Sequence, residues 1–440
     1  MMSQEQNDFI TRVGEGDPAG KLLRQYWQPV ALVDELPDEH PIRAIRVLGK
    51  DLVLFRDEMG KLGLLDKHCP HRGADLSFGR IEDGGLRCPF HGWLFNREGE
   101  CMETPAEPAG SKLCSRIQQP SYPVVEKSGI IFGYFGQGEP PAFPELDCFV
   151  APDTHVFAFK GLIECNWLQA LEVGIDPAHA SFLHRFFEDE EVEKSYGKQF
   201  RSTSINSDLP VTQVLREYDC PEIQVEGTDI GMRLTTIREL DEQIRHVRVT
   251  NLFFPQAIVI PMSPEMTITQ WHVPVDDFNC YWYAIFTSFT DAVNKEQMRS
   301  QRLELYELPD YISRRNRSNN YGFDAQEQRT KTYLGMGEDI NVHDQWAVES
   351  LGAIQDRTRE HLGTTDKGII FYRRMLIKAI REVLEGGSDI PLRLTAESAK
   401  SVTGPIAIDG VTDQAPVDFY QNADKERRAQ SPWAQREHAQ

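Results

Sequence analysis

Four side chains that can bind a metal through sulfur or nitrogen lie in two short segments of similar form. Residues 69–71 (CPH) and 88–91 (CPFH) each pair one thiol with one imidazole, and sixteen residues separate the two segments. A glycine follows each histidine closely, at Gly73 and Gly92. Because glycine adopts positive φ without strain, both segments can turn tightly around a bound centre. The candidate ligands are Cys69, His71, Cys88 and His91.

Two kinds of metal site are compatible with these four residues. Structural zinc sites usually pair cysteine with cysteine and histidine with histidine along the chain. Here each segment mixes the two ligand types, which suits a two-metal cluster better. One iron would take Cys69 and Cys88 and the other His71 and His91, the ligation of a Rieske [2Fe–2S] centre. The pattern therefore predicts a Rieske cluster, with a zinc-stabilised binding protein as the alternative of another class.

His179 and His184 form a second candidate pair. Side chains five residues apart point about 140° apart on a regular helix, so they share one metal only where the helix ends or is irregular. Asp176-Pro177 predicts such an interruption, because proline suits a first helical turn and aspartate caps it. The alternative is a helix cap followed by two histidines that bind no metal.

A carboxylate would complete this second site. Ferrous iron that activates O₂ is often held by two histidines and one carboxylate, with positions left open for other ligands. We expect the third ligand to be Asp344, at the start of a predicted C-terminal helix. Asp339, Glu349 and Asp356 are the competing acids, each better explained as a solvated or ion-paired side chain.

The elements that position these residues predict an α+β fold. Short β-rich runs separated by turns extend from residue 27 to about 150, which indicates a small all-β domain. We therefore assign residues 1–150 to an N-terminal segment and the cluster domain, whose core is 27–150. Residues 151–390 form the second domain, and residues 391–440 are expected to be a C-terminal arm or mobile tail.

The second domain contains both helical and strand patterns. A helix is predicted over 165–175, and strands recur between 197 and 290 with many aromatic and β-branched residues. Such strands favour an antiparallel sheet curved enough to enclose a cavity. Helices are then predicted over 292–308 and 343–386.

Composition excludes several classes of partner. The 440-residue chain carries a net charge of −21, which argues against nucleic acid and against an anionic membrane. The N-terminus has no signal-peptide pattern, and the longest apolar stretch, 252–262, is too short to span a bilayer. Eight cysteines in a chain of this length do not indicate a disulfide framework, so we expect a cytoplasmic protein.

The two motifs, CPH-x16-CPFH and the later ExxxDxxHxxxxH, resemble those of Rieske non-heme iron aromatic ring-hydroxylating oxygenases. Within that family the chain is similar to α-subunits of the phthalate dioxygenase class, which includes phthalate and chlorobenzoate dioxygenases. The resemblance covers nearly the whole chain. It implies a helix-grip catalytic domain with one [2Fe–2S] cluster and one mononuclear Fe(II) per subunit, the latter on His179, His184 and Asp344. Electrons would come from NAD(P)H through a separate flavin and iron–sulfur reductase.

The resemblance also implies how electrons reach the iron. Subunits would join head to tail as a trimer or as stacked trimers, so that His91 of one subunit hydrogen-bonds to Asp176 of the next. Asp176 would also contact His179, and its position three residues earlier on the same helical face agrees with that role. Glu172 is either part of the same network or a surface acid.

The implied substrate is an aromatic carboxylate, which O₂ would convert to a cis-dihydrodiol. A monooxygenase that demethylates or hydroxylates an aromatic acid is the alternative. In the predicted strand MRLTTIREL, Arg238 shares its pleat with apolar residues and should face the cavity, where its planar fork matches a carboxylate. Pairing with Glu239 or Glu242 is the competing interpretation. The weaker candidates are Arg201, Arg245 and Arg248.

Overall fold

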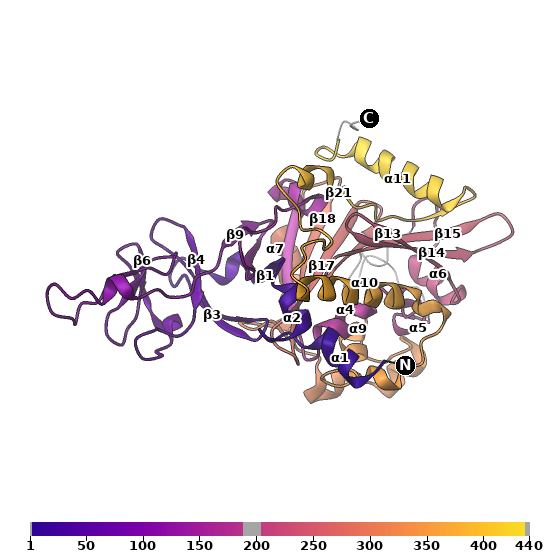
Figure 1. Cartoon of the computed structure of the whole chain (residues 1–440). Coiled ribbons are helices and arrows are strands. Elements are labelled where there is room, and N and C mark those ends of the chain that lie inside the picture. The colour runs from indigo at the N-terminus through magenta and orange to yellow at the C-terminus, as the bar shows by residue number, and fades with distance from the viewer. Residues whose placement is uncertain (1, 188–203, 436–440) are drawn as a thin grey trace.

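The computed structural model describes residues 2–187 and 204–435, which form a smaller β-rich part and a larger α+β part (Figure 1). The smaller part contains β3 (Lys50–Arg56), β4 (Leu62–Asp66) and β6 (Gly85–Arg87). It projects from one end of the larger part, which holds the long strands and most of the helices. The predicted α+β class is confirmed.

Three small antiparallel sheets build the smaller part. The first has the order β1 (Trp27–Leu32), β10 (Ile130–Tyr134) and β9 (Val124–Lys127), and the second joins β2 (Ile42–Val47), β3 (Lys50–Arg56) and β4 (Leu62–Asp66). The third runs β5 (Arg80–Glu82), β6 (Gly85–Arg87), β7 (Leu94–Phe95) and β8 (Cys101–Glu103). Cys69 and Cys88 are buried in one hydrophobic core with aromatic residues of β3 and β7. The two predicted ligand segments therefore meet in this part of the molecule.

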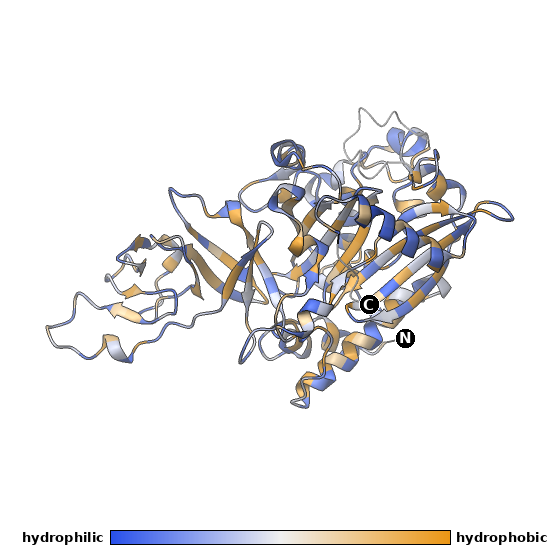
Figure 2. Cartoon of the chain, turned by 90° about the horizontal axis from the view of Figure 1, so that it is seen from above, coloured by the Kyte–Doolittle hydropathy of each residue, from blue (hydrophilic) through white to orange (hydrophobic). Residues whose placement is uncertain are grey.

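One antiparallel sheet organises the larger part. Its strand order is β12 (Val156–Ile163), β18 (Cys280–Ser288), β17 (Met266–Pro274), β16 (Ala257–Ser263), β15 (Arg245–Phe253), β14 (Gly231–Glu239) and β13 (Glu222–Thr228). Hydrophobic and hydrophilic residues alternate along several of these strands in Figure 2, as expected when the two faces of a sheet meet different surroundings. Each face of the sheet thus presents regular rows of side chains to the elements packed against it.

Helices lie against the sheet and carry the second site. These are α4 (Trp167–Val173), α5 (Ala180–Leu183), α9 (Ile340–Ser350) and α10 (Lys367–Leu384). The helix expected over 343–386 is divided, because the chain leaves helical geometry after α9 at Gly352 (φ 93°) and returns only at α10. Along α10 the buried residues recur at helical spacing, with Ile369, Tyr372, Leu376 and Ile380 on one face.

Six further α-helices in the described residues are short. They are α1 (Gln4–Thr11), α2 (Pro18–Leu23), α3 (Asp147–Val150), α6 (Val211–Glu217), α7 (Lys295–Leu303) and α8 (Ala325–Thr330).

The C-terminal segment is a packed arm, not the mobile tail that its polar composition suggests. Strand β22 (Asp409–Thr412) pairs with β15, and α11 (Pro416–Gln430) lies along the outside of the molecule (Figure 1). Phe419 and Tyr420 of α11 are buried against Val247 and Val249 of the sheet. The burial of two aromatic side chains outweighs the polar composition of the arm and holds it in place.

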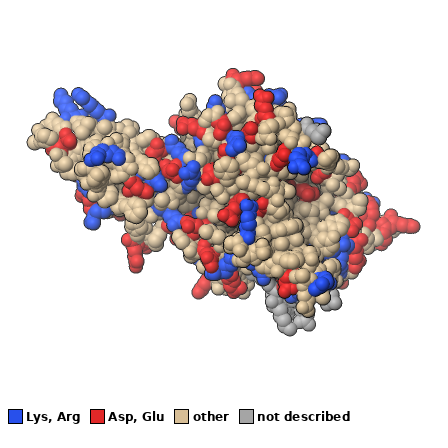
Figure 3. Space-filling view, turned by 90° about the horizontal axis from the view of Figure 1, so that it is seen from below, with Lys and Arg blue, Asp and Glu red and all other residues tan. Residues whose placement is uncertain are grey.

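The charge on the surface is mixed. On the face seen in Figure 3, lysine and arginine side chains stand among aspartate and glutamate side chains. Each helix in the described part of the chain is too short or too polar to cross a lipid bilayer.

Candidate functional site: two metal centres

The two ligand segments of the smaller part form matching loops. In each loop the cysteine N–H donates to the carbonyl five residues later, from Cys69 to Ala74 and from Cys88 to Trp93, both at 2.8 Å. The glycine four residues after each cysteine donates back to its carbonyl and has positive φ, 78° and 76°. A side chain with Cβ is strained in that conformation, so the glycines permit both loops to close.

The four predicted cluster ligands converge between these loops. The Cys69 and Cys88 side chains are 2% exposed, and the ring centroids of His71 and His91 are 4.5 Å apart. Burial raises the pKa of the Cys69 thiol to about 11, so a thiolate here needs a metal to stabilise it. His91 Nδ1 is buried without a hydrogen-bond partner among the described residues, as expected of an atom that ligates a metal. The donor set fits a Rieske cluster.

The backbone around the second site is irregular where Asp176-Pro177 predicts it. Helix α4 ends at Gly174, and α5 spans only four residues, with His179 at its beginning and His184 just after its end. Because a single turn separates the two histidines, their rings can face the same point despite the five-residue spacing. The ring centroids are 5.1 Å apart.

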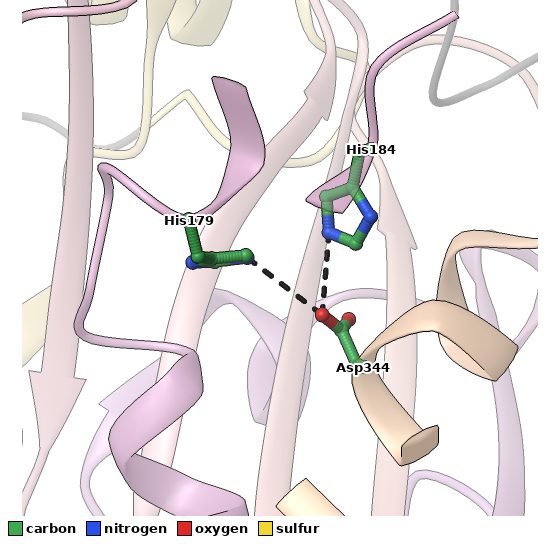
Figure 4. Close-up of side chains that lie close together, drawn as sticks. All are labelled: His179, His184 and Asp344. Atoms are coloured by element: carbon green, nitrogen blue, oxygen red, sulfur yellow. Dashed lines mark ion pairs between the residues drawn. The ribbon is translucent and has the colours of Figure 1, made fainter. Parts of the chain in front are cut away.

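Asp344 of α9 faces both rings (Figure 4). Its Oδ1 lies 3.2 Å from His184 Nε2 and 3.7 Å from His179 Nε2, and the three ligand atoms lie within 4.8 Å of one another. Burial acts to raise the pKa of Asp344, but His184 and His179 in their protonated forms outweigh it and lower the pKa. Two imidazole nitrogens and one carboxylate on one side of a point are the ligand set of oxygen-activating ferrous iron.

The competing acids are engaged elsewhere. Asp339 caps α9 by accepting from the Asn341 N–H, and Asp356 accepts from Thr358. Glu349 accepts a 2.6 Å hydrogen bond from Tyr321. Their bonds are those of helix caps and buried polar networks, so Asp344 is the acid that the fold delivers to the histidines.

Asp176 contacts His179, although not through its carboxylate. The backbone carbonyl of Asp176 lies against His179 Nδ1, while its Oδ1 accepts the Ala178 N–H at 3.1 Å. A carbonyl only accepts, so His179 carries a proton on Nδ1, and in the neutral ring Nε2 is then bare and faces Asp344.

Glu172 is buried and ion-paired. It is 5% exposed, and its carboxylate binds Arg357 at 2.8 Å and Arg373 at 2.6 Å. Burial acts to raise the pKa of Glu172, but the two guanidinium groups outweigh it and lower the pKa. The surface-acid interpretation is wrong, and Glu172 joins α4 to α10 through Arg373.

A cavity extends from the second site along the sheet. Residues of α4, α5 and α9 form one wall, and side chains of β14 to β17 that share one face form the other. Arg238 lies in the sheet wall as its pleat predicted, 2% exposed. It donates to the Tyr218 carbonyl at 2.9 Å and weakly to Ser181 Oγ at 3.4 Å, while its Nη1 is buried without a partner among the described residues.

The other candidate arginines differ from Arg238. Arg248 also lines the cavity, but Asp409 of the C-terminal arm binds it at 2.7 Å. Arg245 lies near Glu239 at 3.5 Å, and Arg201 falls outside the described residues. Burial lowers the pKa of Arg238 to about 10, so it still carries its charge at neutral pH.

Several polar residues of the cavity were not predicted from the sequence. Gln270 and His272 lie on the same face of β17, a polar pair within an apolar strand that alternation along the strand could have revealed. Asp409 had no local signal, because β22 reaches the cavity only through its pairing with β15. The cavity residues not foreseen are Gln270, His272, Asn341 and Asp409.

Replacing Asp344 with alanine tests the iron site. Asp344→Ala should reduce bound iron to the content of the cluster, because two imidazoles alone hold Fe(II) weakly. The visible spectrum of the cluster should stay unchanged. Iron and acid-labile sulfide would be measured on the purified protein. Asp339→Asn, at the N-cap position before α9, is the control and should keep all its iron, because asparagine also caps a helix; full iron occupancy in Asp344→Ala would remove Asp344 from the ligand set.

Comparisons with known proteins agree with both centres. Residues 26–123 match the Rieske [2Fe-2S] domain, and residues 133–403 match the LigXa C-terminal domain-like family. The Rieske match covers both ligand segments, so the zinc interpretation is set aside.

Curated relatives resemble the chain over most of its length. The oxygenase subunit of phthalate 4,5-dioxygenase from Pseudomonas putida is 34% identical, with 89% of each chain covered. A tert-butanol monooxygenase oxygenase subunit from Aquincola tertiaricarbonis is 31% identical over 90% of this chain and 80% of its own.

Solved structures share the fold. Dicamba monooxygenase has a TM-score of 0.56 at 19% identity, covering 82% of this chain and 98% of its own. The oxygenase in the reduced complex with ferredoxin of carbazole 1,9a-dioxygenase has a TM-score of 0.52 at 22% identity, covering 81% and 90%. The predicted family is confirmed: this chain belongs to the Rieske non-heme iron oxygenases, as an oxygenase subunit that carries a [2Fe–2S] cluster and a mononuclear iron and receives its electrons from a separate redox protein.

Proposed function

We propose that this subunit uses O₂ to convert an aromatic carboxylate to a cis-dihydrodiol. The observation that carries the proposal is one cavity that contains both the iron ligands and the buried Arg238. When bound, the cluster supplies single electrons and the iron supplies the site of O₂ activation. The chain itself orients the substrate and keeps water from the reacting ring.

Arg238 is the group we assign to the substrate carboxylate. A guanidinium buried in a largely apolar wall is costly unless an anion or several acceptors satisfy it. Its Nε is already bonded to a carbonyl, but Nη1 has no partner among the described residues. A benzoate-type carboxylate would satisfy Nη1 and would direct the ring along the cavity toward His179 and His184.

Relatives support an aromatic acid as the substrate. Three that are 29–34% identical are named as phthalate 4,5-dioxygenase, phenoxybenzoate dioxygenase and 3-chlorobenzoate-3,4-dioxygenase subunits. A monooxygenase is the second candidate, since a 5,5'-dehydrodivanillate O-demethylase subunit is 30% identical. The two reactions differ in which substrate atom faces the iron. We propose dioxygenation, and demethylation is the alternative.

The route of the electrons depends on assembly. The cluster loops lie near β6 at one end of the molecule in Figure 1, whereas α5 and α9 lie in the larger part. We infer a head-to-tail ring of three subunits, alone or stacked, in which Asp176 receives the partner subunit's His91. His91 Nδ1 is buried, so His91 Nε2 is the ring nitrogen that remains for this contact. A heterologous interface that closes a ring repeats the contact at every subunit.

The remaining partners follow from this chemistry. We infer that a flavin and iron–sulfur reductase passes electrons from NAD(P)H to the cluster. The cytoplasm is the compartment we propose, because the cysteines, which all lie in the described residues, form no disulfide, in agreement with a reducing environment.

Labelling with ¹⁸O₂ tests the reaction type. Turnover of a benzoate or phthalate isomer with a reductase should place two labelled oxygen atoms in one product, measured by mass spectrometry. A methoxybenzoate tested in parallel reports demethylation. A single labelled atom, or loss of the methyl group as the main reaction, would establish the monooxygenase instead.

Asp176→Asn tests the electron route. The amide keeps the size of the side chain but loses its charge, so turnover should fall about 10- to 100-fold. Iron content and reduction of the cluster by the reductase should stay normal, as followed by metal analysis and stopped-flow absorbance. Asp356→Asn, a change in a helix cap outside the cavity, should leave turnover unaltered. Wild-type turnover in Asp176→Asn would exclude Asp176 from the route.

Arg238→Gln tests the substrate assignment. Loss of a charged hydrogen bond, worth about 1.5–3 kcal/mol, should raise KM about 10- to 100-fold for acids and much less for their amides. Steady-state oxygen uptake on matched acid and amide pairs measures the difference. The control is Arg233→Gln, on the same strand but paired with Glu226. Equal effects on acids and amides would make Arg238 a structural residue.

A further inference from the structure

His343, the residue before Asp344, lies directly behind one of the iron ligands. Its ring is fully buried and stacks on the ring of His184, with centroids 5.6 Å apart and planes inclined by 23°. His343 Nδ1 lies 3.4 Å from His184 Nδ1, and His343 Nε2 lies 2.8 Å from the carbonyl oxygen of Gly337. A row of contacts therefore runs from the Gly337 backbone through His343 to His184.

Only one placement of protons satisfies this row when both rings are neutral. The Gly337 carbonyl can only accept, so His343 carries its proton on Nε2. His343 Nδ1 is then bare and can only accept, which requires His184 to carry its proton on Nδ1. His184 Nε2 is left bare, and this atom faces Asp344 at 3.2 Å.

The two ligand histidines thus reach the same tautomer by different means. His179 Nδ1 meets a backbone carbonyl, that of Asp176, whereas His184 Nδ1 meets an imidazole that a second carbonyl orients in turn. A backbone carbonyl is present whatever the side chain, but the acceptor for His184 depends on the identity of residue 343. The side chain at 343 therefore controls whether His184 is prepared for a metal.

We propose that His343 is a positioning residue that holds His184 in the Nδ1–H tautomer with Nε2 directed to the iron. The inference depends on His184 as an iron ligand and not on the substrate or the type of oxidation. Groups that hold a ligand imidazole in this way commonly change metal affinity by about 10- to 100-fold when removed.

The test compares two replacements of different hydrogen-bonding capacity. His343→Phe keeps a flat ring against His184 but has no acceptor, so Fe(II) affinity should fall about 10- to 100-fold. In His343→Gln the amide oxygen can accept from His184 Nδ1 and the NH₂ can donate to Gly337, so affinity should stay within a few-fold of wild type. Affinity would be measured anaerobically on cluster-loaded protein whose mononuclear site has been emptied, by competition with a chromophoric ferrous chelator.

The cluster spectrum in the same samples reports whether each variant is folded. If His343→Phe does not keep the cluster, His343→Leu, which is not planar and also lacks an acceptor, replaces it. Wild-type affinity in the variant without an acceptor would overturn the proposal. An equal loss of Fe(II) affinity in His343→Gln and in the variant without an acceptor would also overturn the proposal, because it would show that ring packing and not the hydrogen bond matters. Neither result bears on the aromatic acid or on the number of oxygen atoms inserted.

Discussion

The convergence of one carboxylate and two bare imidazole nitrogens is the constraint on which the larger part of this molecule depends. Asp344 Oδ1 lies within 3.7 Å of the Nε2 atoms of both His179 and His184. Each of these three atoms can offer a lone pair to the same point. When both imidazoles are neutral, a shared cation would stabilise such an arrangement, because the three lone pairs otherwise repel one another. The surrounding elements must therefore hold the three side chains in place.

Several separate devices supply this rigidity. The break between α4 and α5 places both histidines at the ends of one turn, and Asp339 caps α9 so that Asp344 lies in its first turns. Behind them, Glu172 joins α4 to α10 through Arg373. A buried ion pair contributes little net stability compared with an apolar pair, but it specifies which groups meet. We interpret Glu172 as setting the position of α4 relative to α10.

The sheet provides the other half of the site. Because side chains alternate across a strand, β14, β15 and β17 each line the cavity with alternate residues. Arg238 and Arg248 both reach the cavity in this way, but the C-terminal arm brings Asp409 to Arg248 and leaves Arg238 as the candidate anchor for an anion. An element far along the chain thus pairs with one of two similar arginines of the cavity.

What the sequence by itself determined is local. The cluster loops could be predicted because each combines its ligands and its glycine within a few residues, and the interruption at Asp176-Pro177 and the inward face of Arg238 follow from helix and strand geometry. The partners of Glu172, the contact of His343 with His184 and the packing of the arm could not be predicted, since each joins residues more than a hundred positions apart. Only the tertiary structure decides such pairs, because spacing along the chain describes one element at a time and carries no information on which other element packs beside it.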